Sequence, residues 1–150
     1  MDDTLLVRVK KIAAACRQNT SYNLFSVLGI CRVLADLLNP RGQHGMGSVY
    51  LELFLKEVLH WQAVNSDVVK HAVVTAEYLI DEDRRIDLVI ETAGQFLPVE
   101  VKILAGEQKA QCLDYYRFSR AKDPRTKVIY LTRFGTMPSA YSLSDGTERV

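Results

Sequence analysis

The first 61 residues repeat apolar positions at the spacing of one helix face. This pattern predicts a helix from Leu5 to about Asn19, a second from about Tyr22 to Leu38, and a third from about Gly47 to Trp61. The second helix is apolar around most of its circumference, as expected for a helix that packs against a sheet. The segment Asn39-Pro40-Arg41-Gly42 ends it, because Pro and Gly interrupt helical geometry. We therefore expect an N-terminal helical segment.

From residue 71 onward the pattern changes to the alternation and β-branched runs of strands. The predicted strands are His71–Ile80, Ile86–Ile90, Phe96–Ile103 and Lys127–Thr132. A charged turn over residues 81–85 separates the first two strands, and residues 91–95 form the turn of a hairpin. A helical pattern from about Glu107 to Ala121 precedes the last strand. The tail after Gly135 has no core pattern.

The order of these elements is typical of an α/β (α+β) fold with one central mixed sheet flanked by helices. A chain of 150 residues fits a single domain, residues 1–150, that buries a substantial core. No internal repeat or interdomain linker interrupts the sequence.

Charged side chains stand within the most apolar strands of this predicted sheet. Glu100 and Lys102 share one face of their strand, because successive side chains alternate between faces. If the two strand runs pair as a hairpin, Asp87 lies beside them. Buried charges are costly unless they are paired or hold a metal, and two carboxylates suit a hard cation such as Mg²⁺. An ion-pair cluster on a solvent-facing sheet surface is the alternative.

Asp87 followed by the triplet Glu100-Val101-Lys102 resembles the metal-binding core of the PD-(D/E)xK nuclease superfamily. The resemblance implies a restriction-endonuclease-like core and a nuclease that uses Mg²⁺ (or Mn²⁺) to hydrolyse DNA. Asp87 and Glu100 would hold the metal, and the backbone carbonyl of Val101 would be a further ligand. Lys102 would position the attacking water or stabilise the transition state. Asp87, Glu100 and Lys102 are thus the candidate catalytic residues.

Two further clusters carry the resemblance, which extends over roughly residues 20–135. Gln111 and Tyr115 lie one helical turn apart and match the Gln-x-x-x-Tyr motif of the superfamily's exonuclease-like branch. The segment Leu37–Gly45 is similar to a signature of bacterial members that are uncharacterised or associated with defence. The resemblance implies that Gln111, Tyr115 and His44 bind substrate. A polar helix face and a loop-fixing histidine are the structural alternatives.

This sequence departs from the pattern of the resembled family at one position. Many relatives carry an additional glutamate on an N-terminal helix, whereas the corresponding segment Leu28–Val33 has no acidic residue. Glu77, on the strand before Asp87, is a candidate replacement metal ligand, and an ordinary surface glutamate is the alternative. The departure keeps a second hypothesis open: a catalytically degenerate nuclease-fold module that binds nucleic acid or a protein partner.

Composition and charge are compatible with both hypotheses. The formal net charge is +1, yet residues 101–133 hold eight basic and three acidic residues, an excess that suits a phosphate backbone. No apolar stretch is long enough to span a bilayer, and Asp2 and Asp3 replace the basic start of a signal peptide, so we expect a cytoplasmic protein. The three cysteines are widely spaced and indicate reduced packing residues. The apolar second helix and a C-terminal end earlier than in the resembled relatives favour a truncated domain or a homodimer.

Overall fold

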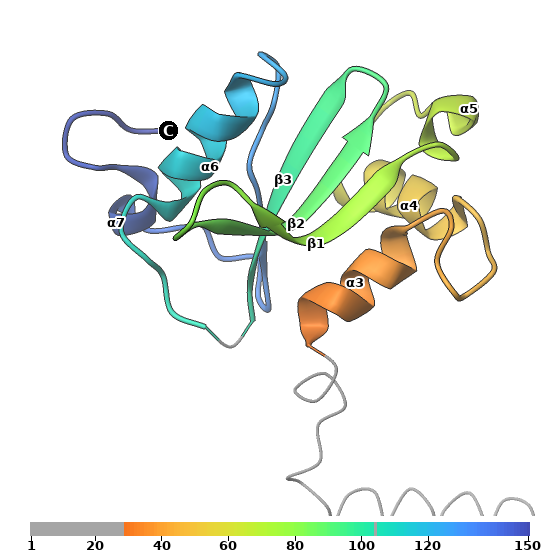
Figure 1. Ribbon diagram of the computed structural model, residues 1–150, viewed down its shortest axis with the longest axis horizontal. Coiled ribbons are helices and arrows are strands. Elements are labelled where there is room, and N and C mark those ends of the chain that lie inside the picture. Colours follow the sequence, from red (N-terminus) through yellow and green to blue (C-terminus); the bar gives the residue numbers. More distant parts are fainter. Residues whose placement is uncertain (1–28, 104) are drawn as a thin grey trace, which may run out of the picture. The chain divides into compact units, whose positions relative to one another are not determined.

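Four strands form one mixed sheet, with helices before it, between its third and fourth strands, and after it along the chain (Figure 1). The computed structural model describes residues 29–103 and 105–150, of which residues 31–150 belong to one compact unit. The elements in chain order are α3 (Ile30–Leu38), α4 (Val49–Leu53), η1 (Phe54–Val58, a π-helix), α5 (Ser66–Val69), β1 (Val73–Leu79), β2 (Arg85–Thr92), β3 (Gln95–Lys102), α6 (Gln111–Arg120), β4 (Ile129–Thr132) and α7 (Ala140–Leu143). The predicted mixed sheet with flanking helices is confirmed.

The strands lie in the order β1-β2-β3-β4, and only β3 and β4 run parallel. The two-residue turn Ala93-Gly94 joins β2 to β3, and Gly94 adopts a φ of 85° that a side chain would strain. The ladder between β2 and β3 ends at the pair Leu88–Val99. The two strands of the predicted hairpin therefore part just before Asp87 and Glu100.

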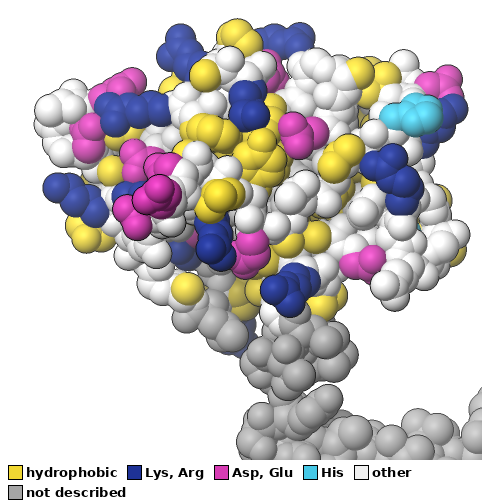
Figure 2. All heavy atoms as spheres, viewed as in Figure 1, with side chains coloured by type: hydrophobic (Ala, Val, Ile, Leu, Met, Phe, Trp, Pro, Cys, Tyr) yellow, Lys and Arg dark blue, Asp and Glu magenta, His cyan; other side chains and the backbone are white. Residues whose placement is uncertain are grey.

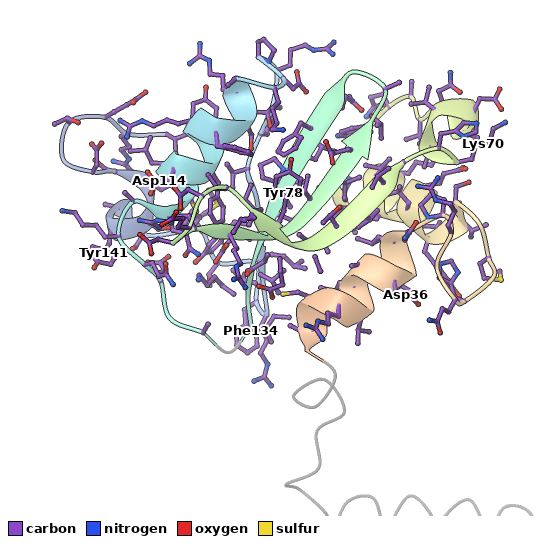
Figure 3. The ribbon with its side chains drawn as sticks, viewed as in Figure 1. Asp36, Lys70, Tyr78, Asp114, Phe134 and Tyr141 are labelled. Atoms are coloured by element: carbon purple, nitrogen blue, oxygen red, sulfur yellow. The ribbon has the colours of Figure 1, made fainter. Side chains whose placement is uncertain are left out.

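An aromatic and aliphatic cluster joins α6 to the sheet. Ile86, Val89, Phe96 and Tyr115 are buried together. Tyr78, labelled in Figure 3, packs on this cluster, and its ring centroid lies 5.5 Å from that of Phe96 in an edge-to-face arrangement. Aromatic pairs favour this geometry. The cluster fixes α6, and with it Tyr115, against β2 and β3.

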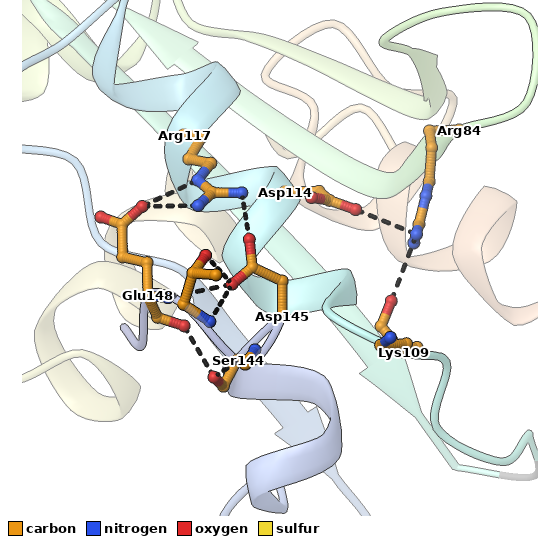
Figure 4. Close-up of polar contacts among 9 residues, drawn as sticks. Arg84, Lys109, Asp114, Arg117, Ser144, Asp145 and Glu148 are labelled. Atoms are coloured by element: carbon orange, nitrogen blue, oxygen red, sulfur yellow. Dashed lines mark hydrogen bonds and ion pairs between the residues drawn. The ribbon is translucent and has the colours of Figure 1, made fainter.

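Ion pairs on the outer side of α6 tie it to two other segments (Figure 4). Arg84, in the turn before β2, contacts Asp114 at 2.9 Å. Arg117 contacts Asp145 at 2.9 Å and Glu148 at 2.7 Å, which connects the helix to the C-terminal tail. Such partly exposed pairs contribute little to stability, because solvent screens their charges. They connect α6, the helix that carries Gln111 and Tyr115, to the turn before β2 and to the C-terminal tail.

Several predicted helix boundaries differ from the structure. The third predicted helix was expected to reach Trp61, but η1 ends at Val58 and His60 has the left-handed φ of 53°. The helix expected from Glu107 begins only at Gln111, after Ala110 in a left-handed conformation. The short helices α5 and α7 were not predicted. The first predicted helix and the start of the second lie outside the described residues.

The strand predictions agree more closely with the structure. Each of the four predicted strands overlaps an observed strand, and α3 ends at Leu38 as expected. No helix within the described residues is long and apolar enough to cross a membrane.

Candidate active site

The carboxylate of Glu100 and the ammonium of Lys102 form an ion pair inside the protein. Both residues extend from β3, and Nζ of Lys102 lies 2.5 Å from Oε1 of Glu100. The Glu100 side chain is 0% exposed and that of Lys102 is 8% exposed. The structure thus brings these two predicted residues together and contradicts the alternative of a cluster on a solvent-facing surface.

Asp87 joins this pair where β2 and β3 part. Its Oδ2 accepts a hydrogen bond of 2.8 Å from the backbone N–H of Val101, the residue between Glu100 and Lys102. The side chain thus replaces a ladder partner at the end of the β2–β3 pairing. Val101 engages the site through its amide, and the role of its carbonyl as a metal ligand stays a prediction.

Burial dominates the electrostatics of Glu100. Loss of solvent raises the pKa of this carboxyl above its ordinary value, and the negative charge of Asp87 raises it further. Lys102 opposes both effects by stabilising the charged form. Oε2 of Glu100 is fully buried and has no hydrogen-bond donor among the described residues, because the nearby hydroxyl of Tyr115 donates to the backbone carbonyl of Arg85 instead. A buried carboxylate oxygen without a donor is costly, and a cation would satisfy it.

Gln111 and Tyr115 of α6 lie beside this site. Nε2 of Gln111 donates a 2.9 Å hydrogen bond to Oη of Tyr115, which itself donates to the backbone carbonyl of Arg85. Burial, and then the neighbouring charge of Glu100, raises the pKa of Tyr115. Gln111 is also buried, and its Oε1 has no hydrogen-bond donor among the described residues. The two side chains are therefore buried and hydrogen-bonded within the protein, and their predicted contact with substrate stays a prediction.

His44 belongs to a self-contained loop. Its Nε2 lies 3.1 Å from the carbonyl oxygen of Asn39, and its Nδ1 accepts a 3.0 Å hydrogen bond from the amide of Met46. The ring also makes an edge contact with Tyr50. Both ring nitrogens are used by the backbone, so the geometry favours loop fixing over the predicted contact with substrate.

The loop that contains His44 requires a glycine at position 42. A Cβ at this position would lie 2.2 Å from the carbonyl oxygen of Asp36 and 2.7 Å from the ring of His44. Oδ1 of Asp36 accepts a hydrogen bond from the amide of Gln43. The turn after α3 is thus held by close backbone contacts that leave no room for a side chain at Gly42.

Glu77 occupies an irregular place in β1. All residues of β1 except Glu77 pair with β2, and the register places Asp87 opposite Glu77. Glu77 has a φ of 55°, an uncommon left-handed conformation within a strand, and it is exposed. Backbone outliers of this kind concentrate at functional sites, but the structure shows no contact between the Glu77 carboxylate and the Glu100–Lys102 pair.

Two residues near the site were not predicted. Burial raises the pKa of the Cys31 thiol to about 11, and the charges of Asp87, Glu77 and Glu100 contribute. Cys31 lies in the segment Leu28–Val33, where the resemblance pointed to a missing glutamate, so its position was the available signal.

The second unpredicted residue is Glu107. It accepts hydrogen bonds from Tyr130 Oη at 2.9 Å and from the amide of Ser139 at 2.8 Å. The bonds from Ser139 are the main cause that lowers the pKa of Glu107, and the charge of Lys102 contributes. These partners are 23 and 32 residues away in sequence. No local pattern would have revealed this contact.

Basic and acidic side chains are interspersed over the face drawn in Figure 2. Within the basic segment 101–133, Lys102 is paired with Glu100, and Arg117 is paired with two carboxylates of the tail. The excess of positive charge in the sequence is therefore partly neutralised in the fold.

The described residues partly fit a divalent metal. They contain no group of three or more His, Cys, Asp or Glu side chains placed to hold a metal ion. Two neighbouring carboxylates are present, however, and one of their oxygens is buried without a donor. Mg²⁺ is commonly held by one or two carboxylates and completes its shell with water and substrate phosphate. Asp87 and Glu100 fit such a site, whereas Glu77 is not gathered with them into a preformed group of three.

Comparison with known families agrees with this geometry. A model described as the PD-(D/E)XK nuclease superfamily matches residues 22–150, which include the whole sheet and every candidate residue. No curated protein and no solved structure matches the chain. The matched region covers most of the chain, and its mixed sheet with flanking helices is consistent with a restriction-endonuclease-like core. The chain belongs to the PD-(D/E)XK nuclease superfamily.

Proposed function

We propose that this protein is a divalent-metal-dependent nuclease that hydrolyses phosphodiester bonds of DNA. The observation that carries the proposal is the buried carboxylate of Glu100, which is paired with Lys102, is repelled by the nearby charge of Asp87, and has one oxygen without a donor. A purely structural ion pair would be expected to satisfy all its polar atoms. An unsatisfied carboxylate oxygen next to a second carboxylate supports a cation site.

Asp87 and Glu100 would hold Mg²⁺ or Mn²⁺. When bound, such a cation supplies positive charge that offsets the negative charge developing on the phosphate. The Val101 amide fixes the Asp87 carboxylate through the 2.8 Å hydrogen bond, so this ligand is preorganised by the backbone of β3 itself.

Lys102 is the group proposed to act on the reacting water and phosphate. Its Nζ is held by Glu100 at 2.5 Å and is largely shielded from solvent, which strengthens the electrostatic effect of its charge. The ammonium would donate a hydrogen bond to the attacking water or to a phosphate oxygen. Tyr115 and Gln111 would act as positioning residues, because Gln111 donates a hydrogen bond to Tyr115, which in turn donates to the carbonyl of Arg85 beside Glu100.

A second candidate function is a non-cutting module that binds nucleic acid or a protein partner. Two observations favour it. The described residues provide no third ligand beside Asp87 and Glu100, and the helix position near these carboxylates holds Cys31 rather than an acid. A thiol with a raised pKa is a poor ligand for Mg²⁺.

Cleavage assays with matched variants separate the two functions. Purified protein is incubated with supercoiled plasmid, linear duplex and single-stranded RNA, each with Mg²⁺, Mn²⁺ or EDTA. The nuclease predicts cutting of DNA with metal, none in EDTA, and none by Glu100→Gln, whereas the exposed control Glu57→Gln remains active. If wild type cuts no substrate and its melting temperature does not respond to millimolar Mn²⁺, the binding module is the correct reading. Cleavage of RNA alone would overturn the choice of DNA.

A further inference from the structure

A cavity of about 440 Å³ opens beside the start of β3, away from the candidate active site. Gln95 and Leu97 line it, whereas Asp87, Glu100 and Lys102 do not. Leu97 and Glu100 are three residues apart on one strand, so their side chains point to opposite faces of the sheet. A cavity of this size is large enough to enclose a small ligand.

Positive charge dominates the lining of this cavity. Arg125 and Lys127 contribute two cations, and Asp123 is the single acidic residue of the lining. Asp123 is already engaged, because Oδ1 accepts from the amide of Arg125 at 2.9 Å and Oδ2 accepts from the amide of Phe96 at 3.3 Å. These hydrogen bonds lower the pKa of Asp123 and stabilise its charge where it is. Among the described residues, Lys127 makes no ion pair.

Arg125 is held in place while most of it remains exposed. Its Nη2 donates a 3.0 Å hydrogen bond to the carbonyl of Gly94, and its Nε lies 3.6 Å from Asp123 Oδ1. The side chain is nevertheless 79% exposed. A guanidinium fixed on one edge still presents N–H donors on the other, and such a fork suits phosphate oxygens.

The lining of the cavity also includes two aromatic side chains. Trp61 and His60 line it directly after η1. The amide of Trp61 donates a 3.0 Å hydrogen bond to the carbonyl of Leu55, and the left-handed φ of 53° at His60 turns the chain there. An indole ring that is only partly buried provides a flat surface on which a nucleobase can stack.

We infer that this cavity binds a nucleoside phosphate, with the base against Trp61 and the phosphate between Arg125 and Lys127. The inference goes beyond the proposed function, because no candidate catalytic residue contributes to the cavity. The same chemistry is offered by a free mononucleotide and by one nucleotide of a single strand. A nuclease domain with such a site would recognise nucleic acid or nucleotide at a point separate from the bond that is cut.

Trp61 provides its own probe, because it is the single tryptophan of the chain. Its fluorescence is recorded in EDTA while dAMP, an oligothymidylate of twelve nucleotides, or inorganic phosphate is added. We expect a saturable change with dAMP or with the oligonucleotide, and binding at least about tenfold tighter than that of phosphate. Tighter binding of the oligonucleotide identifies a strand as the ligand, and tighter binding of dAMP identifies the free nucleotide.

Arg125→Gln and Lys127→Gln are each expected to weaken binding at least about tenfold. Lys70→Gln is the matched control, because Lys70 is also exposed but lies outside the cavity. Circular dichroism melting curves establish that the variants fold. No saturable response to either nucleotide ligand, equal affinity for dAMP and phosphate, or unchanged binding in Arg125→Gln would each overturn the inference.

This experiment is independent of the cleavage assay. Metal-dependent cleavage without any response of Trp61 would overturn the nucleotide cavity and leave the nuclease standing. A nucleotide response without cleavage would support the cavity and count against the nuclease.

Discussion

Removal of Lys102 tests whether the charge at the candidate site is truly buried. In Lys102→Met, the Glu100 carboxylate loses the ammonium at 2.5 Å while remaining 0% exposed and close to Asp87. Loss of one partner of a buried ion pair costs roughly 3–5 kcal/mol, because the remaining charge has no compensation. At a slope of about 2 kcal/mol per molar urea, the unfolding midpoint would fall by about 1.5–2.5 M.

Two comparisons make this prediction specific. Lys56 and Glu52 form the same pair of residue types on the surface, 3.5 Å apart with 46% of the Lys56 side chain exposed. Lys56→Met is therefore expected to change stability by less than about 1 kcal/mol. The double variant Glu100→Gln/Lys102→Met removes both buried charges, and we expect it to recover to within about 2 kcal/mol of wild type.

The assay is urea denaturation followed by circular dichroism, at pH 7 in EDTA and again with Mn²⁺. Excess Mn²⁺ is expected to restore part of the stability of Lys102→Met, about 2.7 kcal/mol at a concentration of 100 times the Kd, because the cation replaces the missing positive charge. A loss in Lys102→Met no larger than that in Lys56→Met would refute the reasoning. So would a double variant as unstable as the single one.

Three further predictions follow from other contacts. Burial raises the pKa of Glu100 above 4.5, so the contribution of Glu100 to stability falls as pH rises from about 4.5 through the folded-state pKa. In urea denaturation in EDTA, the stability of Glu100→Gln relative to wild type should therefore increase across that pH range. A pH-independent difference between the two proteins would contradict this prediction. Gly42→Ala should lose about 2–4 kcal/mol in urea denaturation, because its Cβ would lie 2.2 Å from the carbonyl oxygen of Asp36. Gly106→Ala is the control, because its Cβ would meet nothing within 4 Å, and a similar loss in both variants would contradict the prediction. Tyr115→Phe removes a hydroxyl that accepts one hydrogen bond and donates another. We therefore expect the free energy of unfolding to fall by about 1–3 kcal/mol and cleavage to be reduced. Unchanged stability in urea denaturation would contradict this expectation.

The sheet could be predicted from sequence because its strands are adjacent along the chain. The two apolar strand runs and the Gly94 turn between them are local signals, and the pairing of a hairpin follows directly from them. Helix boundaries were harder because their causes are not local. Glu107 was expected inside the helix, yet its hydrogen bonds to Ser139 and Tyr130 hold it in the loop before α6.

In the candidate site, too, some features follow from local sequence and others depend on contacts between distant segments. Strand alternation was enough to place Glu100 and Lys102 on one face, but their burial depends on how α6 and the rest of the chain cover β3. The termination of the β2–β3 ladder, which frees the Val101 amide for Asp87, is likewise a property of the folded sheet. Cys31 and the Trp61 cavity depend on contacts between distant segments, for which a single sequence carries no pattern.

The buried pair also discriminates between the two functions. An ion pair in the interior gives little net stability, since hydrophobic residues of similar volume serve as well or better. A module that binds nucleic acid through surface cations would have no use for a buried Glu100 with an unsatisfied oxygen. If the protein is only a module, the stable double variant Glu100→Gln/Lys102→Met should retain every binding property of wild type. If the protein is a nuclease, the same well-folded variant should bind DNA but cut none of it, and its melting temperature should no longer respond to Mn²⁺.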